Sequence, residues 1–182
     1  MMSTVDISFE NLLVCGWDDD SDDASSVRLP MSRLGLDENA CVHGTIRLLI
    51  GGRLVPHMGG LPDDVCLAEW LGNLGDVEDA FRAGQNARVV VGGAEQGEPA
   101  FVWEREGEQG HLTIADSEMS SGGVADAQWQ KIPFLVGDFF AAHAHFRAEA
   151  REFIVHEAPH CGLDWWDDWG GGRFEGDAQQ SV

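Results

Sequence analysis

Four residues of one predicted helix carry side chains suited to metal binding or acid–base catalysis. His145, Glu149, Glu152 and His156 follow one another at steps of four, three and four, so they share one face of a helix. Imidazole and carboxylate groups so placed could ligate a metal ion or transfer protons. They lie opposite the apolar stripe of the same helix, where charged side chains normally face solvent. We interpret them as a solvated face, with a metal-dependent enzyme or metal-binding protein as the alternative.

A segment rich in Trp and Asp near the C-terminus is the second candidate. Residues 164–169 hold three of each, and these cannot all be buried because a desolvated carboxylate without a partner is costly. An exposed Trp beside carboxylates suits Arg or Lys, since the ring offers a cation–π contact and the acid a charge-assisted hydrogen bond. The spacing predicts that Trp165 and Trp169 pack inward and that Trp166 faces solvent.

The net charge favours the same kind of partner. The chain has 182 residues, and 32 Asp and Glu against 11 Lys and Arg give a formal charge of −21. Such a surface repels nucleic acid and anionic membranes, so we expect neither as a partner, and it attracts a basic protein. The run Asp18 to Asp23 is expected to be an exposed loop that assists. The residues predicted to contact the partner are Asp164, Trp165, Trp166, Asp167, Asp168, Asp18, Asp19 and Asp20.

The four cysteines give no sequence signature of a metal site. Cys15, Cys41, Cys66 and Cys161 are far apart and form no C-x-x-C pair, whereas structural zinc sites usually show closely paired ligands. Their apolar and small neighbours favour reduced cysteines within the core. We therefore expect no cofactor, and reduced thiols indicate a cytoplasmic protein.

Two common enzyme motifs are missing from the sequence. There is no G-x-S-x-G elbow and no glycine-rich loop followed by GK[ST], which are the signatures of hydrolases and phosphate-binding loops. The N-terminus carries no basic segment followed by a long apolar run, as a signal peptide would. The sequence therefore predicts a protein without catalytic residues.

The pattern of apolar residues predicts an α+β fold. We expect a mostly antiparallel sheet with a long C-terminal helix packed on one face and a shorter helix after the first hairpin, because one apolar helix stripe matches one alternating sheet face. Gly72 and Gly75 divide the shorter helix into two predicted pieces. One core is expected to hold Phe139, Phe146, Phe153, Trp103 and Leu112. The predicted sheet segments are 45–56, 87–115 and 129–136, the strand before them is 5–17, and the helices are 64–74, 76–83 and 137–154.

The order of these elements resembles that of small immunity-type proteins of bacterial toxin systems. The resemblance covers about residues 40 to 155 and rests on the hairpin TIRLLIGGRLVPH, the Trp-bearing helix CLAEWLGNLGDVEDAFRAG, the meander FVWEREGEQGHLTIADS and the closing helix. It implies a cytoplasmic protein that binds and neutralises a toxin, with no catalytic residues to carry over.

The sequence thus predicts a single acidic α+β domain over residues 1–182, with loops at 18–26 and 117–127 and a flexible tail at 170–182. Its predicted function is that of an immunity or inhibitor protein for a basic partner such as a toxin. A further alternative is a salt-adapted accessory protein whose acidity maintains solubility and forms no specific acidic binding face.

Overall fold

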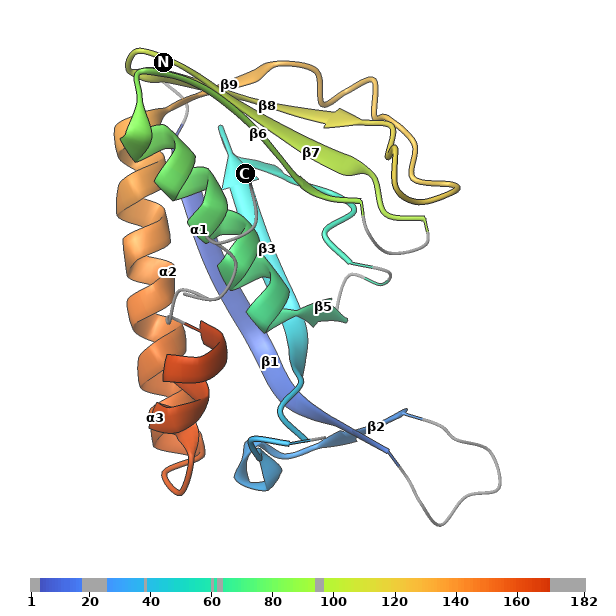
Figure 1. Cartoon of the computed structure of the whole chain (residues 1–182), viewed down its shortest axis with the longest axis vertical. Helices are drawn as coiled ribbons and strands as arrows, with labels where there is room; N and C mark the ends of the chain where they lie inside the picture. The colour runs from blue at the N-terminus through green and yellow to red at the C-terminus, as the bar shows by residue number, and fades with distance from the viewer. Residues whose placement is uncertain are drawn as a thin grey trace, which may run out of the picture.

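The computed structural model describes residues 4–17, 26–37, 39–59, 61, 64–93 and 97–170, and it confirms the α+β class. Two antiparallel sheets have the strand orders β2-β1-β3-β4, with β5 also paired to β3, and β6-β7-β8-β9 (Figure 1). The strands are β1 (Val5–Trp17), β2 (Ser26–Leu29), β3 (Val42–Ile50), β4 (Arg53–Leu54), β5 (Val65–Cys66), β6 (Asn86–Gly92), β7 (Ala100–Glu106), β8 (Gln109–Ala115) and β9 (Ile132–Leu135). The helices are η1 (Met31–Arg33), α1 (Leu67–Ala83), α2 (Val136–Glu157), α3 (Gly162–Trp165) and η2 (Trp166–Gly170).

The prediction that the hairpin 45–56 joins the later strands in one sheet is wrong. On one side β3 pairs with β1 from Val5↔Ile50 to Val14↔Val42, and on the other it pairs with β4 and β5. β4 has only two residues and is followed closely by Pro56, which cannot donate a hydrogen bond to a further strand. Among the residues that the structure describes, the strands β6 to β9 pair only with one another.

The long helix α2 contacts aromatic side chains from both sheets. From the first sheet, the Phe9 ring lies 6.1 Å from Phe146 and 5.5 Å from Phe153. From the second sheet, the Trp103 ring lies 5.5 Å from Phe139. The predicted residues that are fully buried in this common core are Phe139, Phe146, Trp103 and Leu112, whereas Phe153 is partly buried.

The shorter helix is one continuous element, so its predicted division into two pieces is wrong. α1 runs from Leu67 to Ala83 through Gly72 and Gly75. It lies beside α2 (Figure 1) and buries an apolar stripe that begins with Leu67, Trp70 and Leu74. Burial of such a stripe stabilises a helix by more than the ~1 kcal/mol that each interior glycine costs.

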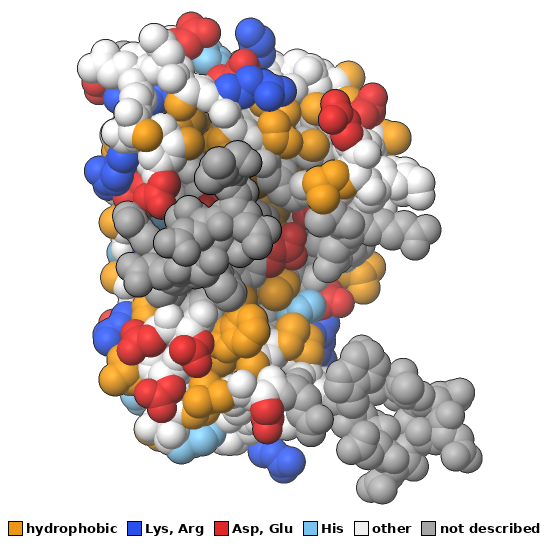
Figure 2. Space-filling view, in the orientation of Figure 1, with side chains coloured by type: hydrophobic (Ala, Val, Ile, Leu, Met, Phe, Trp, Pro, Cys, Tyr) orange, Lys and Arg blue, Asp and Glu red, His pale blue; other side chains and the backbone are white. Residues whose placement is uncertain are grey.

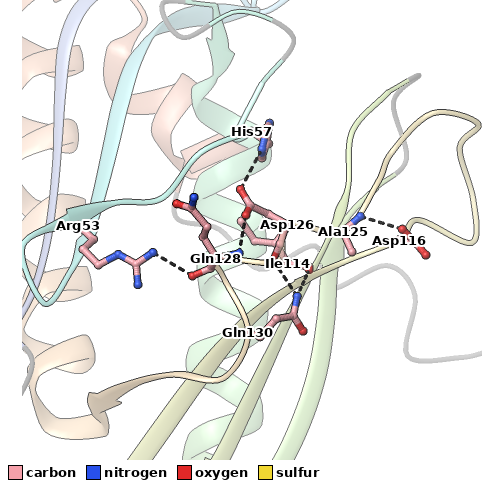
Figure 3. Close-up of polar contacts among 8 residues, drawn as sticks. All are labelled: Arg53, His57, Ile114, Asp116, Ala125, Asp126, Gln128 and Gln130. Atoms are coloured by element: carbon pink, nitrogen blue, oxygen red, sulfur yellow. Dashed lines mark hydrogen bonds and ion pairs between the residues drawn. The ribbon is translucent and has the colours of Figure 1, made fainter.

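The loop between β8 and β9, predicted at 117–127, holds neither helix nor strand but is fastened to the first sheet (Figure 3). Arg53 of β4 donates a hydrogen bond to the carbonyl oxygen of Gln128 at 2.9 Å. His57 lies 3.5 Å from the carboxylate of Asp126. These contacts connect the edge of the first sheet to the second sheet, and they act against the mobility that the Ser- and Gly-rich composition indicates.

A buried histidine joins the two main helices through a hydrogen bond. His143 of α2 is fully buried, and its Nδ1 lies 2.5 Å from the Glu78 carboxylate of α1. Burial lowers the pKa of His143, and nearby Arg147 and Arg82 act in the same direction, although Glu78 opposes them. The folded protein therefore holds this imidazole neutral, with Nδ1–H donating to the carboxylate.

The neutral state of His143 predicts a loss of stability in mild acid. The unfolded chain binds a proton at this residue below about pH 6.5, whereas the folded chain does not, so the free energy of unfolding decreases as the pH falls from about 7 to 5. The pKa of Glu78 is also lowered, but this affects the free energy of unfolding only at pH values below the ordinary pKa of a glutamate. Urea unfolding across this range should show a smaller slope in His143→Gln, which retains a donor for Glu78. His156→Gln, at an exposed site, is the control, and equal slopes in wild type and His143→Gln would contradict the neutral assignment.

Candidate functional site

The C-terminal segment docks against the start of β3 through its first tryptophan. Trp165 is fully buried, and its indole N–H donates to the carbonyl oxygen of Ala40 at 2.6 Å. His160 contacts the carbonyl oxygen of Leu34 at 2.8 Å, and the Cys161 thiol donates to the same oxygen. These bonds attach Leu34 and Ala40 to the C-terminal segment, and Ala40 leads directly into Cys41.

The prediction that Trp166 faces solvent and Trp169 packs inward is wrong. Trp166 is 6% exposed, whereas Trp169 is 41% exposed. Gly170 explains the inward packing, because a Cβ atom at this position would lie 2.6 Å from the Trp166 ring. The close approach of ring and backbone therefore closes the last turn over Trp166 and leaves the next tryptophan at the surface.

The outward side of this segment combines acidic and apolar side chains. Its exposed members, which we call the acidic aromatic surface, are Leu163, Asp164, Asp167, Asp168 and Trp169. Figure 2 shows acidic side chains with hydrophobic ones between them over the end of the molecule where Figure 1 places α3. Of the residues predicted to contact a partner, the three aspartates are exposed here, whereas Trp165 and Trp166 are not accessible. Asp18, Asp19 and Asp20 lie outside the described residues.

The polar face of α2 is open to solvent. His145 lies 3.3 Å from Glu149, with side chains 67% and 50% exposed. His156 is 81% exposed and contacts its neighbour Glu157. Within the described ranges, the one group of three or more side chains placed to hold a metal ion lies elsewhere, in the first sheet. The geometry therefore gives no support to a metal-dependent enzyme at this helix face.

That group combines two cysteines and a histidine from β1 and from around the start of β3. The metal-ligating atoms of Cys15, Cys41 and His43 all lie within 4.8 Å of one another. The backbone N–H of Cys15 donates to the carbonyl oxygen of Cys41 at 2.8 Å, and Cys66 lies directly opposite His43 in the β3–β5 ladder. Cys66 also forms side-chain hydrogen bonds with Cys41 and His43. We call these four residues the cysteine cluster. The prediction of scattered core cysteines is wrong for the three that belong to it.

The cysteine cluster lies on the face of the first sheet that is turned away from the helices. Along β3, Val42 and every second residue after it are buried toward the helices, while His43 belongs to the more exposed set. Cys41 shares the face of His43 because side chains two residues apart on a strand point the same way. Cross-strand pairing adds the remaining two cysteines to that face. All four are partly buried.

Two charged side chains border the cluster. The carboxylate of Asp64 lies 2.5 Å from Nδ1 of His43. The guanidinium of Arg28, which is opposite Cys15 in the β1–β2 ladder, donates to both the Asp64 carboxylate and the Cys15 sulfur. The imidazole is therefore oriented by a carboxylate, and a positive charge faces the thiols.

These contacts favour a thiolate at the cluster. The hydrogen bond from Cys41 lowers the pKa of Cys66 most, and His43 and the backbone N–H of Glu69 lower it further against the effect of burial. The same hydrogen bond raises the pKa of Cys41, which keeps its proton. The pKa of His43 is raised, chiefly by the hydrogen bond with Cys66. The Cys66 thiolate is thus brought together with an imidazole and a second thiol.

One local signal of this site was present in the sequence. Cys41 and His43 form a C-x-H pair just before the predicted strand segment 45–56, and strand alternation places such a pair on one face where the strand extends to it. The other two cysteines come from separate strands, and their approach depends on strand register. Spacing along the chain does not reveal that register.

Comparisons with protein-family models, with curated proteins and with solved structures found no significant match. None of the helices in the described part of the chain combines the length and apolar character needed to cross a lipid bilayer.

The opposite placements of Trp166 and Trp169 predict different roles in stability. Trp166→Ala should lower the free energy of unfolding by about 3–5 kcal/mol, because it removes a buried indole. Trp169→Ala, at a surface position, should change it by less than about 1 kcal/mol. Urea unfolding followed by far-UV circular dichroism measures both. Equal losses in the two variants would contradict the assigned packing.

Proposed function

We propose that this protein is an acidic binding protein that engages a basic protein partner through the acidic aromatic surface. The observation that carries the proposal is the exposure of three aspartates beside a half-exposed indole, Trp169, on a chain with a formal charge of −21. The carboxylates would accept charge-assisted hydrogen bonds from Arg or Lys. The indole would supply contact area and a cation–π contact, as aromatic anchors do at interfaces.

The anchoring of the surface supports this assignment. Trp165 and Trp166 bury their rings beneath it, and the indole of Trp165 is hydrogen-bonded to Ala40. A rigid base reduces the conformational entropy that binding must otherwise remove. The acidic and apolar groups are therefore presented in a fixed arrangement before the partner arrives.

The particular form that we propose is neutralisation of a basic toxin in the cytoplasm. The element order resembles that of immunity-type proteins, and the four described cysteines are free thiols, which suits a reducing compartment. The overall negative field would accelerate the encounter, while the acidic aromatic surface would determine how long the complex lasts.

Removal of the three surface charges tests the role of this surface. A fluorescent arginine-rich peptide serves as the cationic probe, with affinity measured by anisotropy at physiological salt. The triple variant Asp164→Asn, Asp167→Asn, Asp168→Asn should bind the peptide at least about tenfold more weakly than wild type, a loss of about 1.4 kcal/mol. Trp169→Ala should weaken binding by about 2 kcal/mol if the indole is an anchor.

The matched control removes three exposed carboxylates from the second sheet and its loop, at Glu106, Glu108 and Glu118. The variant Glu106→Gln, Glu108→Gln, Glu118→Gln has the same net charge as the test variant, so it reports the effect of the general field. A small loss in this control with a large loss in the test variant supports the proposal. Equal losses in both would show that the acidity acts only as a general field, as in a salt-adapted accessory protein.

A further inference from the structure

The cysteine cluster has the donor atoms of a zinc site. The three sulfur atoms belong to Cys15 of β1, to Cys66 of β5 and to Cys41, which directly precedes β3. The imidazole nitrogen belongs to His43 of β3. Zinc sites that serve a structural role hold four such ligands in a tetrahedron, and Cys₃His is one of their common sets. Thiolate ligands select zinc over harder divalent ions such as magnesium or calcium.

We propose that Cys15, Cys41, His43 and Cys66 bind one zinc ion on the outer face of the first sheet. With zinc–sulfur bonds of about 2.3 Å, tetrahedral geometry places sulfur ligands about 3.8 Å apart. The ligating atoms of Cys15, Cys41 and His43 already lie within 4.8 Å of one another, and Cys66 contacts two of these residues. Cys66 lies outside that group of three but directly opposite His43 in the β3–β5 ladder, so reorientation of its side chain would complete the tetrahedron.

The surroundings of the cluster fit the requirements of a metal ligand. Asp64 contacts Nδ1 of His43, which leaves Nε2 as the ligating nitrogen. A carboxylate in this position commonly orients a zinc-bound histidine and raises its basicity. Zinc with three thiolates carries one net negative charge, and Arg28 lies against both Cys15 and Asp64 to balance it. Binding would release the protons that the thiols hold in the metal-free protein.

The strand ladders give the site its rigidity. Cys15 is joined to Cys41 by a backbone hydrogen bond, and His43 is paired with Cys66. On the other side of Cys41, the carbonyl oxygen of Ala40 accepts the hydrogen bond from Trp165. The ligand positions are therefore fixed by the fold before a metal ion arrives, and the proposal is independent of the function assigned to the acidic aromatic surface.

Cobalt(II) substitution and zinc content test the site in the full chain. Protein purified under reducing conditions without an affinity tag should contain one zinc ion per chain by elemental analysis. Metal-free protein titrated with cobalt(II) should develop the thiolate-to-cobalt charge-transfer absorption of a tetrahedral site. Cys41→Ser should reduce this absorption and weaken zinc binding. Asp64→Asn removes no ligand but weakens the contacts of Asp64 with His43 and Arg28, and it should weaken zinc binding roughly 10- to 100-fold.

Cys161 provides the matched control, because it is the remaining cysteine and its thiol donates to Leu34 instead. Cys161→Ser should bind cobalt and zinc as wild type does, and circular dichroism of the metal-free variants establishes that each is folded. Equal binding by Cys41→Ser and Cys161→Ser would overturn the site. It would also be overturned if zinc-saturated protein left Cys66 open to rapid alkylation by iodoacetamide, because a metal-bound thiolate is protected and an activated nucleophile is not.

Discussion

A single extra residue in β1 determines what the first sheet can do. Opposite Gly44 the strand carries two residues, so the pairing changes from Glu10↔Thr45 to Leu13↔His43. This is a β-bulge, which exchanges the faces of all later side chains in the strand. Before it, Ile7 faces the helices. After it, Val14 does so, and Cys15 is turned to the opposite face beside His43.

The bulge requires the glycine that lies against it. Asn11 adopts a positive φ of 54°, and a Cβ atom at Gly44 would lie 2.9 Å and 3.0 Å from the carbonyl oxygens of Glu10 and Asn11. Because the β1 backbone can approach Gly44 this closely, the strand accommodates the bulge. One face of the sheet then stays packed on α2, and the other face assembles the cysteine cluster. The C-terminal segment meets the same region, because Trp165 holds Ala40 next to the cluster. Core, metal-ligating side chains and the acidic aromatic surface thus depend on one stretch of the β1–β3 ladder.

Periodicity along the chain was sufficient to predict the long helix, the position of the shorter one, most strands and a core containing Phe139 and Phe146. It could not predict that β1 would pair with β3 along its length, since that pairing is between distant segments, and so it gave one sheet where there are two. The cysteine cluster was missed for the same reason: Cys15 and Cys66 reach His43 only through register and a bulge. At the C-terminus the composition correctly indicated that part of the segment is exposed, but Gly170 decides which tryptophan is buried.

In our proposal, the bulged ladder assembles a zinc site from residues scattered through the sequence. X-ray absorption at the zinc edge of the purified protein tests it most directly, because the spectrum gives the type and distance of the ligating atoms. We expect about three sulfur atoms at about 2.3 Å and one imidazole nitrogen at about 2.0–2.1 Å. A first shell of oxygen and nitrogen atoms alone would contradict it.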